Sequence, residues 1–343
     1  MKRPFLTGLL SFLALPALAQ SGFSADLRLR AEHADVPNRA LLQRERASAR
    51  LQWDGLWGES IEYGAGLRLA LGSDANANNG VNLDNQRSDA VELDRAFVRG
   101  RWGEAHAWTL GRDALPMSLS PLLWDQDLRP TGASVDLHWA VRDFDGLRIT
   151  AGVFEPGLRV GSEARLAALQ LGYRWHDGAP CRMSLLLTLL HFDHLDALPA
   201  DGLARTNRVS SGRLLSDYRL RDVQWIGHGE VAGKPLQLRL NWVVNQGADD
   251  HNEAARIALQ WGDRTQPRGW EIGIAQQRQQ RDAVLAAVSD DDWWFHSFTR
   301  GGMLWVGYGL NERWSLRLAG FRERRDDASE HAQRVLLDLE ARW

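Results

Sequence analysis

Arginine recurs at every second residue in several short segments of this chain. Arg28 and Arg30 do so in one segment, and Arg44 and Arg46 in the next, with Arg50 four residues further on. In an extended strand, residues two apart point to the same face. Each segment would therefore present a row of guanidinium groups. Such rows could line an aqueous space, attract anions and orient polar solutes.

The candidate residues of this charged face are those that alternate with apolar positions. Arginine outnumbers acid among them, which favours small anions, carboxylates included. The pattern also fits arginines that only hydrate the space and pair with its acids. Lysine is nearly absent, so the arginine excess also reflects composition. The arginines are Arg28, Arg30, Arg44, Arg46, Arg50, Arg68, Arg95, Arg99, Arg101, Arg165, Arg239, Arg256 and Arg317, and the acids are Asp26, Glu32, Glu62 and Glu271.

A further group of charges lies in the long connection 113–132. Asp125, Asp127 and Arg129 stand near its tip, and Arg112 comes directly before it. If this connection folds into the lumen of a barrel, its acids and bases would face the arginine rows and create a transverse field. The sequence therefore predicts that the connection 113–132 narrows the lumen.

Two motifs could supply metal ligands, and neither predicts a site. His191, Asp193 and His194 lie close together, but alternation sends His194 to the opposite face from the other two. Residues 74–80 imitate the first half of an EF-hand loop, but Asn85 stands where a bidentate glutamate belongs. Ordinary polar loops account for both motifs.

Nucleophilic catalysis has equally little support. The sequence contains no Gly-x-Ser-x-Gly elbow, and Ser210, Ser211 and His228 are near one another only along the chain. We therefore expect no catalytic residues, no metal site and no cofactor.

Strands must position these charges, and the clearest predicted strand is 334–343. Apolar and mostly charged residues alternate along it, and it ends on an aromatic residue. This pattern is typical of the last strand of an outer-membrane β-barrel. The apolar positions are Val335, Leu337, Leu339, Ala341 and Trp343, and the alternating ones are Arg334, Leu336, Asp338, Glu340 and Arg342.

The same alternation recurs along most of the chain and predicts sixteen strands. Short connections alternate with long ones at 72–91, 113–132, 192–221 and 280–301, as in bacterial barrels with short periplasmic turns and long external loops. The predicted strands are 23–32, 44–53, 61–71, 92–102, 106–112, 133–141, 147–154, 165–175, 182–191, 222–231, 236–245, 255–261, 270–279, 302–310, 314–322 and 334–343.

Tryptophan supports the membrane interpretation. Indole rings collect at membrane interfaces, and nine of the sixteen tryptophans fall at the predicted periplasmic end of the strands. A secreted, soluble all-β protein fits the alternation but gives no reason for that placement. The nine are Trp53, Trp102, Trp108, Trp139, Trp175, Trp261, Trp270, Trp314 and Trp343.

The N-terminus and the composition point to export. Residues 1–19 have the charged start, the apolar run and the small-x-small end of a cleaved signal peptide, which leaves 20–343 as the barrel. Cys181 is the only cysteine, so one chain can form no disulfide. The net charge of −3 does not suggest nucleic-acid binding.

Two stretches resemble a porin family of Gram-negative outer-membrane β-barrels. One is Leu122-Leu123-Trp124-Asp125-Gln126-Asp127-Leu128-Arg129-Pro130-Thr131-Gly132, after Leu110-Gly111-Arg112; the other runs from Arg281 through Ser289-Asp290-Asp291-Asp292 to Trp314-Ser315-Leu316. Leu93-Asp94-Arg95-Ala96-Phe97-Val98 is a weaker third similarity. Thr131 and Asp113-Ala114-Leu115-Pro116 depart from the family's pattern, so the resemblance supports the fold more than any solute.

The expected molecule is an all-β, transmembrane, antiparallel β-barrel of 16 strands with an inward-folding loop. It would let small hydrophilic solutes or ions diffuse passively across the outer membrane, with some preference for anions. An outer-membrane hydrolase and a ligand-binding or adhesive barrel remain alternatives. The expected partners are outer-membrane lipid, lipopolysaccharide and the barrel assembly machinery, through the strand ending in Trp343. A homotrimer would bury a patch that alternation cannot distinguish from a lipid-facing surface.

Overall fold

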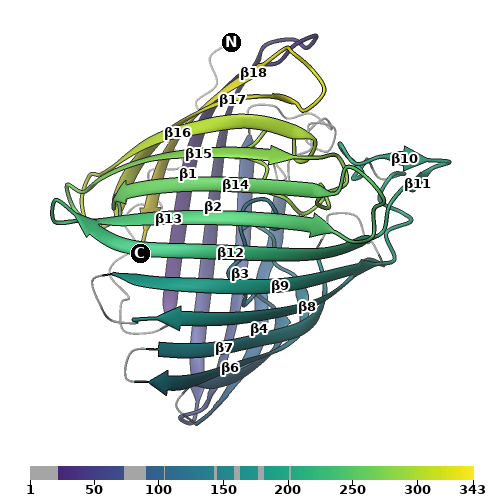
Figure 1. Ribbon diagram of the computed structural model, residues 1–343. Coiled ribbons are helices and arrows are strands. Elements are labelled where there is room, and N and C mark those ends of the chain that lie inside the picture. The colour runs from purple at the N-terminus through teal and green to yellow at the C-terminus, as the bar shows by residue number, and fades with distance from the viewer. Residues whose placement is uncertain are drawn as a thin grey trace.

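Sixteen antiparallel strands close into one barrel, and β1 is hydrogen-bonded to β18. Figure 1 shows the barrel from the side. The computed structural model describes residues 22–72, 90–103, 105–142, 145–157, 163–176, 181–200 and 202–343. A two-stranded hairpin, β10–β11, stands apart from the barrel. The strands are β1 Phe23–Asp35, β2 Leu42–Trp57, β3 Ile61–Gly72, β4 Ala90–Trp102, β5 His106–Arg112, β6 Thr131–Arg142, β7 Asp145–Glu155, β8 Arg165–Trp175, β9 Arg182–Asp193, β10 Val209–Ser210, β11 Arg213–Leu214, β12 Tyr218–Val231, β13 Lys234–Asn245, β14 Glu253–Gly262, β15 Trp270–Gln279, β16 Thr299–Gly309, β17 Trp314–Arg325 and β18 Ala332–Arg342.

The predicted fold class is confirmed, and each predicted strand overlaps one barrel strand. The reason is visible in β18, where side chains point alternately outward and inward. Val335 and Leu337 are 43% and 46% exposed on the outer surface, whereas Leu336 and Asp338 are buried inside. The hairpin β10–β11 was not predicted, because two-residue strands leave no alternation to detect.

The connections differ at the two ends of the barrel. One end, here called the short-turn end, carries turns such as 58–60, 232–233 and 310–313. The chain also closes there, since the amide of Trp343 donates a 2.9 Å hydrogen bond to the carbonyl of Ala25. The opposite, long-loop end carries 113–130, 194–217 and 280–298.

Aromatic side chains gather at the short-turn end. Trp53 packs against Tyr63 with ring centroids 5.2 Å apart, Trp270 against Tyr308 at 4.8 Å, and Trp314 against the terminal Trp343 at 5.8 Å. Trp53 and Trp270 are about half exposed on the outer surface. Pairs of this kind are typical of an interfacial aromatic belt.

Three predictions fall wholly or mostly outside the described residues, namely the signal peptide 1–19, the EF-hand-like stretch 74–80 and the long connection 72–91. In the described part of the chain, no helix is long and apolar enough to cross a membrane.

Candidate functional site

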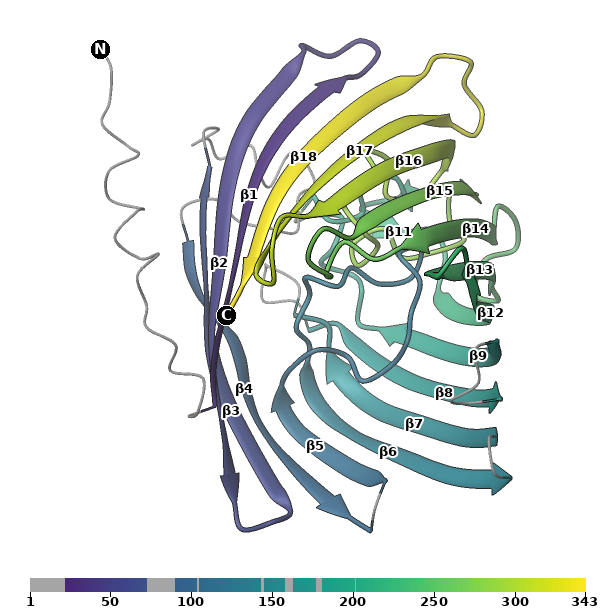
Figure 2. The same cartoon turned by 90° about the vertical axis from the view of Figure 1, so that its left-hand side faces the viewer.

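Two long loops meet inside the barrel. The first inner loop, 113–130, joins β5 to β6, and Figure 2 shows it running between the barrel walls. The second inner loop, 280–298, joins β15 to β16. The amide of Asp125 donates to the carbonyl of Val288 at 2.7 Å, and the amide of Asp290 donates to that of Pro121 at 3.1 Å. The two loop tips are therefore joined by backbone hydrogen bonds.

An apolar cluster holds both loops against one side of the lumen. Leu122 and Leu123 of the first inner loop and Val284 and Leu285 of the second are almost completely buried. Burying one such side chain stabilises a fold by about 1.5–3 kcal/mol. Their partners are inward-facing apolar residues of the wall: Phe154, Leu166, Leu190, Phe192, Tyr218, Leu220 and Val243.

Ion pairs fix the start of the first inner loop. Gly111 has a φ of 113°, a conformation that residues with a side chain rarely adopt, and the chain leaves the sheet just after it. Asp113 then accepts from Arg95 Nε at 2.7 Å and from Arg99 Nη2 at 2.8 Å, and both arginines belong to β4. The loop is thus tied to the wall before it crosses the lumen.

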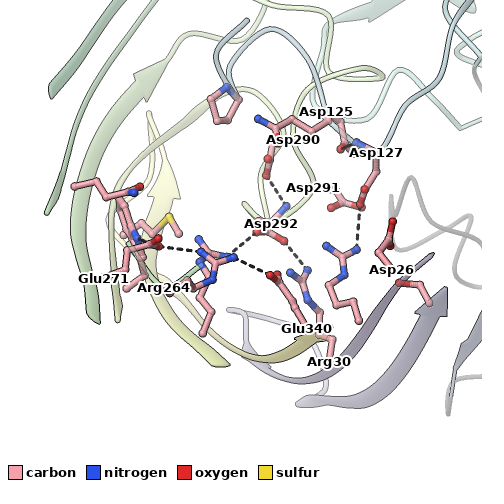
Figure 3. Close-up of a pocket in the computed structure, with 18 of the residues that line it drawn as sticks. Asp26, Arg30, Asp125, Asp127, Arg264, Glu271, Asp290, Asp291, Asp292 and Glu340 are labelled. Carbon is pink, nitrogen blue, oxygen red and sulfur yellow. Dashed lines mark hydrogen bonds and ion pairs between the residues drawn. The ribbon is translucent and has the colours of Figure 1, made fainter. Parts of the chain in front are cut away.

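A charged cavity of about 630 Å³ remains between the loop tips and the opposite wall. Figure 3 shows carboxylates of both tips facing arginines of the strands. Arginines and carboxylates line the cavity in nearly equal number. The strands and the turn before β15 contribute Asp26, Arg28, Arg30, Arg50, Arg68, Arg239, Arg256, Arg264, Glu271, Arg317, Glu340 and Arg342, and the loops contribute Asp125, Asp127, Asp290, Asp291 and Asp292.

Asp127 is the carboxylate of the first inner loop that contacts the β1–β2 wall. Arg28 Nη2 lies 3.0 Å from its Oδ2, and Arg50 Nη2 lies 2.7 Å from its Oδ1. Burial alone would raise the pKa of Asp127, but Arg28, Arg50 and Arg68 outweigh that effect and hold the pKa well below its usual value. Asp127 therefore keeps its charge at any physiological pH.

Asp292 plays the corresponding part on the second inner loop. Its Oδ1 lies 2.5 Å from Arg30 Nη1, and its Oδ2 lies 3.6 Å from Arg317 Nη1. Arg30 also binds Asp338 of β18 through Nε at 2.6 Å and Nη2 at 2.9 Å. Burial opposes the charge of Asp292, but these arginines and Arg334 keep its pKa below the usual value.

Asp290 has the opposite character. Burial, and then the neighbouring carboxylates of Asp292 and Asp291, raise the pKa of Asp290 to about 7. Its Oδ1 accepts a 2.9 Å hydrogen bond from the amide of Asp292, and Arg256 of β14 is the nearby cation that partly offsets the shift. One carboxyl group of the cavity thus changes its charge near neutral pH.

Arg239 and Arg256 supply positive charge on the β13–β14 wall. Arg239 Nε donates to Gln237 Oε1 at 2.8 Å, and Arg256 Nη1 donates to Gln277 Oε1 at 2.7 Å. Arg256 also lies over the ring of Trp293, 5.7 Å from its centroid. Among the described residues, no carboxylate lies within ion-pair distance of either guanidinium. Their charge reaches the cavity without a contact ion pair in the described part of the chain, and Asp290 is the carboxyl group that interacts with Arg256 at longer range.

The structure brings together nine of the predicted lining residues and places six elsewhere. Arg28, Arg30, Arg50, Arg68, Asp125, Asp127, Arg239, Arg256 and Arg317 line the cavity. Arg44 and Arg46 bind Glu32 at 2.6 and 3.4 Å, and Arg95 and Arg99 bind Asp113. Arg112 donates to the carbonyl of Asp94 at 3.3 Å, and Arg129 to that of Leu128 at 3.1 Å.

Two arginines of the predicted charged face differ from the expectation. Arg165 is exposed on the outer side, because the buried neighbours Ala164 and Leu166 take the inward positions. Arg101 is exposed and binds Glu62 at 2.9 Å near the short-turn end.

The contribution of the second inner loop was missed. The alternation of short and long connections predicts that the loop of Asp290, Asp291 and Asp292 is external, whereas in the structure it lies inside the barrel. A signal was present, since Ala283-Val284-Leu285-Ala286-Ala287-Val288 is too apolar for a solvated loop. Arg264 and Glu340, 2.9 Å apart, were also missed, and Arg264 lies in a turn without alternation.

The other motifs remain apart. Ser210 and Ser211 belong to the hairpin region at the long-loop end, whereas His228 lies towards the short-turn end of β12. The strand between Tyr218 and His228 alone spans roughly 30 Å, so these residues share no site. His191 Nε2 contacts Asp193 Oδ2 at 3.0 Å. Among the residues that the structure describes, no group of three or more His, Cys, Asp or Glu side chains is arranged for a metal ion.

No protein-family model matches the sequence, and no curated protein sequence matches it. Solved structures do. OprB of Pseudomonas putida, in its high-pH structure, superposes with a TM-score of 0.63 at 12% identity, covering 95% of each chain. The chain has the porin fold. A loop L8 deletion mutant of OmpT, an outer membrane protein of Vibrio cholerae, gives a TM-score of 0.54 at 10% identity, and so does a triple mutant of the Rhodopseudomonas blastica porin. Both cover 94% of this chain and 99% of their own.

The porin fold explains why the wall strands alternate so regularly. A closed barrel leaves no unpaired edge, and in a barrel that spans a membrane the outer face is apolar while the inner face is wet. In this porin fold the departures from alternation are the inward apolar residues beneath the two inner loops.

Proposed function

We propose that this protein is an outer-membrane porin of a Gram-negative bacterium that lets small hydrophilic solutes and ions diffuse passively through its lumen. The charged cavity inside a closed, outwardly apolar barrel is the observation that carries the proposal. The likeness in fold to the Rhodopseudomonas blastica porin supports it. Diffusion through such a lumen needs no cofactor and no energy source.

In this proposal the two inner loops form the constriction. They fill one side of the lumen with the apolar cluster and leave passage only beside the charged wall. A solute there passes through the charged cavity, beside the ion pairs of Asp127 and Asp292 and past Arg239 and Arg256. The carboxylates of the loop tips and the arginines of β13 and β14 together create a field across the cavity that orients dipolar solutes and slows apolar ones.

The proposed filter leans towards anions. Asp127 and Asp292 each lie beside two arginines, so much of their charge is offset. Arg239 and Arg256 lack such partners among the described residues, and Asp290 is only partly ionised at pH 7. The net field that a small solute meets is therefore positive.

Single-channel recording of the refolded protein in planar bilayers tests this function. We expect discrete, stable conductance steps, and a reversal potential in a KCl gradient that corresponds to chloride preference. Silence from protein shown to be folded by heat-modifiable gel mobility would overturn the pore. It would leave an occluded barrel that binds or processes ligands. Steps with potassium preference would overturn only the anion selectivity.

A further inference from the structure

Four arginines form a cluster on the outer surface at the long-loop end. Arg278 of β15, Arg300 of β16, and Arg322 and Arg324 of β17 alternate with inward residues on three adjacent strands. Arg300 lies directly opposite Arg278 on one side and Arg324 on the other. Like charges at directly paired positions repel each other, so an arrangement of this kind needs anions nearby.

The protein itself supplies few negative groups that could neutralise these four arginines. Arg278 forms an ion pair with Asp326 at 2.8 Å, and Arg324 donates to the backbone carbonyl of Ala328. Within the described part of the chain, Arg300 and Arg322 have no hydrogen bond or ion pair. Two adjacent guanidinium groups are thus left with their donors free, and guanidinium groups bind phosphate well.

A hollow of about 570 Å³ adjoins these two arginines on the same outer surface. It exists because Gly302 and Gly320 leave outward positions without side chains, and a Cβ built on Gly320 meets nothing within 4 Å. Leu304, which is 61% exposed, and Val335 border it on the side away from the long-loop end. Arg300, Arg322, Arg324 and His331 form its basic rim.

We propose that this hollow binds a phosphorylated, acylated glycolipid of the outer leaflet, with its phosphate on Arg300 and Arg322 and an acyl chain beside Leu304 and Val335. Leu304 lies four residues along β16 from Arg300, or roughly 13 Å away, so headgroup and chain contacts fit one lipid molecule. The inference rests on the proposed outer-membrane location, because only there does this surface face lipid. A free phosphate ion would leave the apolar part of the hollow unused.

The hollow beside β5–β9 is a weaker candidate for the same lipid. It is also apolar, but both arginines of its basic rim, Arg219 and Arg221, lie on β12, and His191 of β9 is the other basic residue there. The hollow at Gly320 is favoured because its neighbouring arginines are spread over the three strands β15, β16 and β17.

Native mass spectrometry of the refolded barrel in non-ionic detergent with EDTA tests the proposal. The ligands are bisphosphorylated lipid A, its dephosphorylated form, and inorganic phosphate as competitor. We expect the first to bind, the second to bind much more weakly, and phosphate to displace little at equal concentration. Arg300→Gln with Arg322→Gln should weaken lipid A binding roughly 30-fold, as expected for two surface arginines on an anionic lipid.

Two further variants separate charge from shape. Gly320→Leu fills the hollow, leaves the arginines in place and should weaken lipid binding. Arg165→Gln removes an outward arginine at the same end of the barrel and should change nothing. Equal affinity of the wild type and the arginine double variant, or of the two lipid A forms, would overturn the site. Full displacement by inorganic phosphate would overturn the lipid assignment.

Conductance measurements test the lipid site and the proposed pore separately. The arginine cluster faces outward, so the double variant should conduct as the wild type does and keep its heat-modifiable mobility. Lipid binding without conductance would contradict the pore alone, and conductance without phosphate-dependent lipid binding would contradict this site alone.

Discussion

The amide of Asp125 donates a 2.7 Å hydrogen bond to the carbonyl of Val288, which joins two loops that leave the barrel on different sides. Neither loop is anchored by its tip alone. Each carries a buried apolar segment, which fixes its position, and an acidic tip, which reaches the charged wall. A change in one loop should therefore affect the other.

The first prediction concerns Asp127, which lies between Arg28 and Arg50. Asp127→Asn removes a charge that stays ionised and leaves both arginines without it, so chloride preference should rise. We expect about a twofold change in the anion-to-cation permeability ratio, the factor for one charge at roughly 10 Å in water. Reversal potentials in a KCl gradient measure it.

Asp249 provides the matched control for this change. It is an exposed carboxylate in the loop between β13 and β14, so Asp249→Asn should leave selectivity unchanged. An unaltered reversal potential for Asp127→Asn would place the ion path away from the first inner loop.

The second prediction concerns pH. The pKa of Asp290 is raised to about 7, so this carboxyl is largely neutral at pH 6 and largely ionised at pH 8. Lowering the pH across this range removes one negative charge beside Asp291, Asp292 and Arg256. Chloride preference should increase as the pH falls, by up to about twofold in dilute salt.

Asp290→Asn fixes that residue in its neutral form and tests the assignment. The variant should show high chloride preference at both pH 6 and pH 8, with a flatter pH profile than the wild type. If the variant and the wild type changed in parallel, another group would be responsible for the titration.

The wall of the barrel was predictable from sequence because each strand repeats one local rule. Arg28 and Arg30 reach the lumen for the same reason that Leu337 reaches the outer surface, namely alternation. The same rule failed where the chain leaves the sheet. Asp290 and Arg264 lie in connections, and their positions depend on tertiary packing that no periodicity encodes.

The sequence also could not predict which carboxylate each inward arginine contacts. Arg50 and Arg95 both follow the inward alternation, but Arg50 contacts the loop tip while Arg95 binds Asp113 at the base of the loop. Which carboxylate each arginine meets depends on the path of the first inner loop. That path depends in turn on apolar contacts distant in sequence, such as those of Leu122 with the second inner loop.

The third prediction concerns those apolar contacts. Leu285 is 1% exposed within the cluster, and Leu285→Ala should lower the free energy of unfolding by about 2–5 kcal/mol. Because the cluster positions both loop tips, the open-channel current should also become noisier. Urea unfolding in detergent and single-channel recording measure the two effects.

Leu41→Ala is the control for that variant, since Leu41 is 54% exposed in the connection between β1 and β2. It should change stability by less than about 0.5 kcal/mol. Quiet channels in Leu285→Ala, despite the lost stability, would mean that the loop tips are held by their ion pairs rather than by the cluster.

The fourth prediction separates the two sources of positive charge in the cavity. Arg28, Arg30 and Arg50 form ion pairs with carboxylates, whereas Arg239 and Arg256 donate to glutamine side chains and form no ion pair among the described residues. Arg239→Gln with Arg256→Gln should therefore reduce chloride preference by about fourfold, because each removed charge contributes a factor of about two. Arg165→Gln with Arg219→Gln, a pair on the outer surface, should leave it unchanged. If both double variants kept the reversal potential of the wild type, the anion preference would have to arise at the β1–β2 wall, where each arginine shares its charge with a loop carboxylate.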